Sequence, residues 1–281
     1  MSGAALLQVA AMALLNGGFG WLAGLLLTRQ LQALPSAGPG GGKALAAGAA
    51  VSLAGGIGVL WATAALMGDS GLGEAATMIW PVAVGTAVGQ SVLAGTAALL
   101  LAAGTARRWP ALGAILLLLY VLVRAAVSHG GAGGMVSVGY AVDAAHLWLV
   151  GIWFGVVAVA GWCALGQKEP PDHALGQWLG RLSATAAFAL AGIVASGLWN
   201  SWHRLTAPAE LWTHPWGVLL SIKLGLFLAA ALLGAWNRWI GFPRAARGQR
   251  RGAILVLRIE SLILFCTLIA AAALATRQPP G

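Results

Sequence analysis

Long apolar stretches follow one another along this 281-residue chain, and they restrict its fold more than any other feature. Several exceed the roughly 18 residues that an α-helix needs to cross a hydrocarbon core about 30 Å thick. Transmembrane β-strands would alternate apolar and polar residues in pieces of about ten, and these stretches do not alternate. Only 8% of the residues are charged, whereas soluble domains carry about a quarter. We therefore predict an all-α, polytopic membrane bundle.

Clusters of glycine and proline between the stretches mark the ends of eight predicted transmembrane helices. The predicted spans are Ala4–Thr28, Lys43–Met67, Ala75–Gly104, Pro110–Val127, Val138–Leu165, Trp178–Asn200, Trp216–Trp236 and Gly252–Ala275. The segments between them are too short for a separate soluble domain, so residues 1–281 are expected to form a single integral membrane domain. The N-terminus lacks the basic segment and cleavage site of a signal peptide, and we expect the first span to be retained.

The distribution of basic residues predicts how the bundle is oriented. The net charge of +9 would indicate a nucleic-acid partner in a soluble protein, but here the basic residues lie mostly in short joints between spans, so no nucleic acid is expected. Alternate joints carry Arg29 and Lys43; Arg107 and Arg108; Lys168 and Arg181; and Arg238, Arg244, Arg247, Arg250 and Arg251. Because joints rich in Lys and Arg stay in the cytoplasm, we predict that both termini lie outside.

With this orientation, four of the five histidines fall at or near the outer face, together with several methionines. Imidazole and thioether groups suit copper, and thioether favours Cu(I). A methionine is also a common core filler, and a single outer histidine is often only an interfacial polar residue, so the sorting to one side is the stronger signal. The candidate metal ligands are His146, His129, Met135, His203, His214 and Met78.

The fifth predicted span contains an ionisable pair, Asp143 and His146. Asp143 lies three residues before His146 and Trp153 seven after it, so the three share one helical face. Ionisable residues inside a span are costly and usually functional. Asp143 is expected to accept a hydrogen bond from His146, which would fix the ring for metal binding, to pair with Arg124 or Lys223, or to do both.

Several other polar groups fall within apolar stretches. The charged ones are Arg124, Lys223, Arg258 and Glu260, and they are expected to pair across helices because an unpaired charge there costs several kcal/mol. Cys163 and Cys266 lie in apolar segments without a CxxC spacing, so neither a disulfide framework nor a zinc finger is expected. These cysteines could relay a soft metal, although a small buried cysteine more often only fills space.

The order and spacing of several motifs in the C-terminal half match a known family. The motifs are Asp143-x-x-His146 with Trp153-Phe-Gly155, Ser196-Gly197-Leu-Trp-Asn200, Pro215-Trp216-Gly217-Val-Leu-Leu220-Ser-Ile-Lys223, Asn237-Arg238 and Arg258-x-Glu260. From Arg124 to Pro279 the chain resembles the copper resistance D (CopD) family of bacterial inner-membrane proteins. Residues 109–281 thus form a CopD-like part with helices four to eight, whereas helices one to three, in residues 1–108, are generic.

The resemblance implies passage of copper across the inner membrane, or its delivery there, often with a periplasmic copper-binding partner of the CopC type. His146 matches the histidine of the family's fifth helix. His129 looks like the family's preceding histidine, although the usual Gly-His order is altered here. His214 stands where the family pattern has Thr, and His203 stands where the pattern requires no histidine.

The function predicted first is a copper importer that captures Cu(I) or Cu(II) at the outer His/Met site and carries it inward between helices four to eight. The sequence shows no ATPase domain or P-loop, so transport would be passive or coupled to a gradient or a partner. A second possibility is a membrane copper chaperone that serves an outer cuproenzyme or oxidase. A third is a haem-binding electron carrier, which needs two facing histidines within spans, and His146 alone is plainly inside one. No HExxH or Ser/His/Asp pattern occurs, and an enzyme is not expected.

Overall fold

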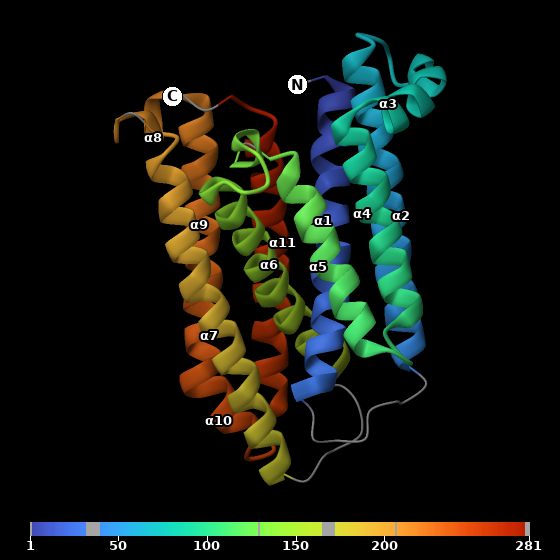
Figure 1. Ribbon diagram of the computed structural model, residues 1–281. Helices are drawn as coiled ribbons and strands as arrows, with labels where there is room; N and C mark the ends of the chain where they lie inside the picture. Colours follow the sequence, from blue (N-terminus) through green and yellow to red (C-terminus); the bar gives the residue numbers. More distant parts are fainter. Residues whose placement is uncertain (1, 32–39, 129, 165–171, 206, 279–281) are drawn as a thin grey trace.

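The computed structural model describes residues 2–31, 40–128, 130–164, 172–205 and 207–278, and its elements are helices that run along one axis (Figure 1). The long helices are α1 (Gly3–Leu31), α2 (Gly40–Met67), α4 (Ala87–Thr105), α5 (Pro110–Ala126), α6 (Val138–Val159), α7 (Asp172–Trp202), α9 (Pro215–Trp236) and α11 (Arg250–Ala275). The short ones are η1 (Glu74–Met78), α3 (Ile79–Gly85), η2 (Gly130–Gly133), α8 (Glu210–Thr213) and α10 (Phe242–Ala245). The predicted polytopic helical bundle is confirmed.

Seven of the described helices are long and apolar enough to cross a membrane. The remaining predicted span corresponds to α5, an apolar helix of 17 residues that lies beside them. Its crossing of the membrane therefore stays a prediction, as does the placement of both termini outside.

The third predicted span, Ala75–Gly104, is wrong as a single helix. The chain breaks at Thr86, whose backbone is extended (φ −123°, ψ 146°) between α3 and α4. The Thr86 hydroxyl accepts a hydrogen bond from the Gly89 amide at 3.0 Å, which caps α4 in the way threonine often caps helices. The apolar composition continues across this cap, which is why hydropathy alone did not reveal the break.

Two long helices end in π-helical turns. Residues Ala160–Ala164 (η3) continue α6, and residues Asn237–Gly241 (η4) continue α9 before α10 begins. Such wide turns are rare in proteins as a whole, but those that occur are often found at functional sites. Hydropathy does not predict them, because it does not depend on the hydrogen-bond register of a helix.

Helix α1 is the centre of the bundle and the most deeply buried of the candidate spans. Its backbone lies directly against that of α6 where two pairs of glycines meet. A Cβ atom on Gly24 would overlap the Gly155 carbonyl, one on Gly155 would overlap the Gly20 carbonyl, and one on Gly151 would overlap the Phe19 ring. Small residues four apart let helices approach closely in membranes, where apolar burial does not drive association.

Two apolar cores form on either side of this crossing. The first lies among α1, α2, α4 and α5 and includes Phe19, Leu99 and Tyr120. The second lies among α6, α7, α9 and α11 and includes Trp153 and Leu257. Each half of the chain thus packs its own core, and α1 and α6 join the halves.

The helices alternate in direction, so α1 begins and α11 ends at the same end of the bundle (Figure 1). We call this the outer end, after the orientation that the charges predict. It also carries α3 and α8, on opposite sides. The other end, the inner end, carries α10 and the arginine-rich turn that precedes α11.

The glycine crossing predicts a steep cost for a single methyl group. Gly155→Ala should lower the free energy of unfolding by about 1–3 kcal/mol, the usual cost of overpacking a core, because its Cβ would meet backbone that cannot move aside. The measurement is denaturant unfolding in detergent micelles. Gly225→Ala on α9, where a Cβ meets open space, is the control, and equal stability of the two variants would contradict the crossing.

Candidate functional site

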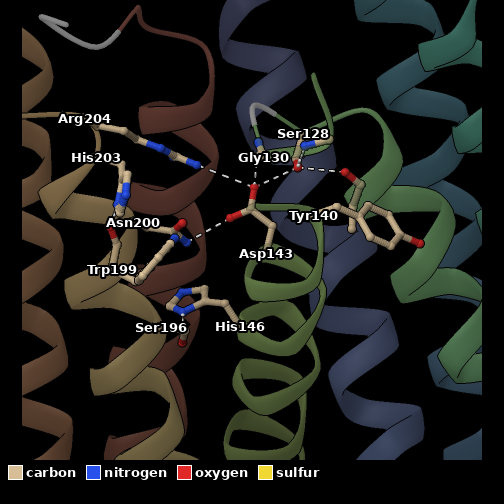
Figure 2. Close-up of polar contacts among 12 residues, drawn as sticks. Ser128, Gly130, Tyr140, Asp143, His146, Ser196, Trp199, Asn200, His203 and Arg204 are labelled. Carbon is tan, nitrogen blue, oxygen red and sulfur yellow. Dashed lines mark hydrogen bonds and ion pairs between the residues drawn. The ribbon is translucent and has the colours of Figure 1, made fainter. Parts of the chain in front are cut away.

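The Asp143 carboxylate is the centre of a polar cluster at the outer end of the bundle (Figure 2). Helix α6 begins just before it, because the Ser137 hydroxyl accepts the Tyr140 amide at 3.2 Å and caps the helix. Asp143 Oδ2 accepts hydrogen bonds from the Ser128 hydroxyl at 2.7 Å and from the Gly130 amide at 3.1 Å. One carboxylate thus ties α6 to the segment that follows α5.

The same carboxylate also binds α7. Asn200 Nδ2 donates to Asp143 Oδ1 at 2.8 Å, and Arg204 forms an ion pair with Oδ2 at 3.5 Å. Both partners come from the outer end of α7. The Asp143 side chain is 12% exposed and that of Arg204 24%, so the pair is only partly shielded from solvent. Solvent-accessible ion pairs contribute little to stability. The hydrogen bonds from neutral donors therefore carry much of the attachment.

The predicted hydrogen bond from His146 to Asp143 is wrong, because the imidazole bonds Ser196 of α7 instead, with Nδ1 2.8 Å from Oγ. The predicted pairing of Asp143 with Arg124 or Lys223 is likewise replaced by the pair with Arg204. Asp143, three positions earlier on α6, is a neighbour of His146, but the imidazole bonds Ser196 on the facing helix α7.

The hydrogen bonds of Ser196 favour one tautomer of His146. The Ser196 hydroxyl lies 2.6 Å from the Gly192 carbonyl, which can only accept a proton. When the hydroxyl donates to Gly192, its oxygen accepts from Nδ1 of the imidazole, and Nε2 of His146 keeps a free lone pair. This is the arrangement in which one ring nitrogen is held by a protein partner and the other can bind a metal.

Three charged side chains act on the His146 ring. Asp143 contributes one negative charge, and Arg204 and Lys223 contribute two positive ones. Lys223 comes from α9 and also lies within electrostatic range of Asp143 and Arg204. The carboxylate of Asp143 is already paired with Arg204. A cation at Nε2 therefore has to be held mainly by coordinate bonds.

The other predicted ligands are spread over the outer end. His203 stacks on Trp199 with ring centroids 4.3 Å apart, and its Nδ1 lies 2.8 Å from the Trp199 carbonyl. His214 caps α9 by accepting the Trp216 amide at Nδ1.

The two predicted methionine ligands are exposed. Met135 is 71% exposed in the segment before α6, and Met78 is 40% exposed beside α3. His129 lies outside the described residues. Within the parts of the chain that the structure describes, no three His, Cys, Asp or Glu side chains gather closely enough to hold a metal.

The intramembrane charges have neutral partners rather than the predicted ion pairs. Arg124 of α5 lies 2.9 Å from the Met12 sulfur of α1. Arg258 of α11 donates to a backbone carbonyl of η3 at 3.0 Å and lies over the Trp162 ring. Glu260 accepts from Trp153 Nε1 at 3.2 Å. Arg258 and Glu260 thus have local partners, whereas the Nε atom of Arg124 is buried without a hydrogen-bond partner. None of the contacts of these three residues is an ion pair.

Sequence reasoning assigned no role to Ser196, Asn200, Ser128 or Arg204. A usable signal existed for the first two, because Ser196 and Asn200 are four residues apart and therefore share the face of α7 that meets α6. Ser128 and Arg204 lie just beyond the ends of helices. Helical spacing does not apply there, so it could not predict which residues they contact.

The comparisons with known proteins agree with the resemblance in the C-terminal half. Residues 176–274 match the model of the family described as copper resistance protein D. This range covers Ser196, Asn200 and Lys223, and it begins after Asp143 and His146. The chain is 31% identical over 139 residues to the inner membrane protein YebZ of Escherichia coli, an alignment that covers 48% of each chain.

A second relative is the copper transport protein CutJ of Bacillus subtilis, 29% identical over 161 residues, which are 57% of this chain and 29% of CutJ. The chain thus matches less than half of the length of either curated relative. No solved structure matches the chain significantly. Residues 176–274 are thus similar to the copper resistance protein D family, and the relatives together with the apolar helices indicate a multi-pass inner-membrane protein.

The Asp143 cluster predicts a stability effect that is larger than that of an ordinary surface carboxylate. Asp143→Asn keeps the size of the side chain but removes the negative charge that binds Arg204. It also replaces one of the two oxygens that accept hydrogen bonds with an NH₂ group. The free energy of unfolding should fall by roughly 1–3 kcal/mol, the cost of unsatisfied buried groups. Unfolding in micelles measures it beside Glu74→Gln, an exposed carboxyl, which should have no effect. A loss no greater than that of the control would contradict the role of Asp143.

Proposed function

We propose that this protein captures copper at the outer end of the bundle, with Nε2 of His146 as the central ligand, and passes it inward. The observation that carries the proposal is the 2.8 Å contact of His146 Nδ1 with Ser196, which holds the ring and leaves Nε2 available for a metal. The resemblance to copper resistance protein D and to a copper transport protein supports copper as the metal.

The local charges favour a soft metal over a hard one. The carboxylate near His146 is paired with Arg204, so an ion held mainly by electrostatic attraction to oxygen ligands, such as Mg²⁺ or Ca²⁺, finds little to bind it there. Cu(I) forms strong coordinate bonds with imidazole and thioether groups.

Further ligands are proposed from the same end. His203 is three residues beyond Asn200 and shares its helical face, and its Nδ1 contact with a carbonyl leaves Nε2 free. His129 stays in the set because its chain neighbours Ser128 and Gly130 both bond Asp143. The exposed Met135 lies in the same segment. His214 and Met78 flank the outer end and are proposed only as peripheral capture ligands.

The proposed route inward follows one face of α6. Trp153 lies two turns beyond His146 on that face, roughly 10 Å along the helix axis, and bonds Glu260. Ions that left His146 would move between α6, α7 and α9 towards this pair. We propose import as the direction, coupled to a gradient or a partner.

One observation favours the alternative of a membrane chaperone that holds copper for an outer enzyme. The Trp153 and Phe227 rings meet edge to face with centroids 5.4 Å apart, and they lie between α6 and α9 on the proposed route. In this arrangement the rings would have to separate before an ion could pass. A periplasmic partner of the CopC type would deliver or receive copper at the outer end in either case.

Copper binding and uptake test these functions together. His146→Ala should abolish high-affinity copper binding and slow uptake into liposomes. Ser196→Ala should weaken copper affinity about 10- to 100-fold, the usual effect of losing the group that orients a ligand. Binding is measured as metal content and by competition with a chelator, and uptake with a copper-sensitive dye inside the liposomes.

His173→Ala, at the inner start of α7, is the matched control and should behave like the unmodified protein. Stoichiometric binding without uptake would sink the importer and leave the chaperone. Unchanged binding in His146→Ala would refute the proposed site itself.

A further inference from the structure

A pocket with several polar side chains in a mostly apolar wall lies nearer the inner end, between α7 and α9 and against α6 and α11. Its volume is about 190 Å³, enough for several water molecules. Most of its wall is apolar and includes Leu190 and Phe242. The polar side chains that line it are Trp153, Ser183, Asn237, Arg238, Trp239 and Glu260. The pocket is distinct from the outer cluster, which lies about two helical turns away along α6.

Asn237 places a buried, unpartnered hydrogen-bond acceptor at this pocket. Its side chain is 1% exposed and lodged in the π-turn η4, where a Cβ on Gly241 would overlap Oδ1. Its Nδ2 donates to the Ala253 carbonyl at 3.4 Å, whereas Oδ1 is buried without a hydrogen-bond partner. A buried acceptor left unpaired costs about 1–3 kcal/mol, so a donor that occupies the pocket is expected to satisfy it.

Glu260 lines the same pocket from α11. It is 2% exposed, and the hydrogen bond it receives comes from Trp153 Nε1. Helix α9 passes close to it at Gly234, where a Cβ would lie 3.1 Å from Oε1. An ionised carboxylate held by a single neutral donor in such surroundings is costly. Carboxyl groups inside membrane spans are typical of proton relays.

The charged groups that face Glu260 are few. Among the residues that line the pocket, Arg238 is the one other charged side chain, and its guanidinium donates to the Ser183 hydroxyl at 3.0 Å. Helix α6 contributes Trp153 and Val157, α7 contributes Leu182 and Ser183, and α9 contributes small apolar residues. Arg258, two positions away on α11, points to η3 instead.

This composition suits a proton better than a metal. Hard cations need about six or more oxygen ligands, whereas the pocket offers one carboxyl group, one amide oxygen and one hydroxyl. Cu(I) prefers sulfur and nitrogen ligands, and the pocket contains no His, Cys or Met. A carboxyl group that exchanges its proton with water in the pocket needs no further ligand.

We propose that Glu260 is a proton-binding site, that the protonated carboxyl is linked through pocket water to Oδ1 of Asn237, and that its protonation couples copper movement to a proton gradient. The coupling part rests on the proposed copper function, whereas the proton site does not. Trp153 connects the two sites, because it shares a face of α6 with His146 and bonds Glu260 directly.

The proton site is tested first without copper, in the whole protein in lipid. Infrared difference spectra between acid and alkaline pH should show a carboxylic C=O band that is lost in Glu260→Gln and kept in the control Glu74→Gln. The glutamine keeps the acceptor for Trp153, so the fold is expected to survive. In Asn237→Leu the band should shift, because the linked water is displaced. A spectrum that is unchanged in Glu260→Gln would overturn the proton site.

Coupling is tested separately in liposomes that take up copper. An imposed pH gradient should speed uptake by the unmodified protein and leave uptake by Glu260→Gln unaffected. An equal response of the two proteins would overturn the coupling role. If the unmodified protein takes up no copper, the importer proposal fails, while the infrared band still decides whether Glu260 binds a proton.

Discussion

The contact of two helix backbones at the centre of the bundle determines the rest of the arrangement. Gly20 and Gly24 of α1 meet Gly151 and Gly155 of α6 so closely that added methyl groups would overlap backbone or ring atoms. Lipid is as apolar as the helix surfaces, so helices in a membrane gain little from burying leucine, and close packing has to supply the attraction. This crossing sets the rotation of α6, which places Asp143, His146 and Trp153 on the side that faces α7 and α9.

A single carboxylate then attaches three parts of the outer end to one another. Asp143 binds the segment after α5 through Ser128 and Gly130, and it binds α7 through Asn200 and Arg204. Because α7 is positioned in this way, Ser196 can reach His146. The proposed metal-binding form of the imidazole thus depends on two separate contacts of α7, that of Asn200 with Asp143 and that of Ser196 with His146 and the Gly192 carbonyl.

The sequence predicted the helical class and the approximate spans, because these depend on the length and composition of apolar stretches. It predicted the shared face of Asp143 and His146 because that depends on their spacing along one helix. It did not predict the break at Thr86 or the π-turns, since a cap or a change of hydrogen-bond register leaves the apolar pattern unchanged. It assigned the wrong partner to His146, because Ser196 is 50 residues away. Contacts across helices follow from packing, and no spacing rule reveals them.

The glycine crossing also bears on how this protein can diverge. It demands small side chains at a few positions of α1 and α6 and places little further demand on the N-terminal helices. Substitutions elsewhere in that half are expected to leave the proposed copper and proton sites where they are, provided its own core still packs. Helices α1, α2 and α4 are therefore expected to tolerate substitution better than α6 to α11, except at the glycines where α1 meets α6.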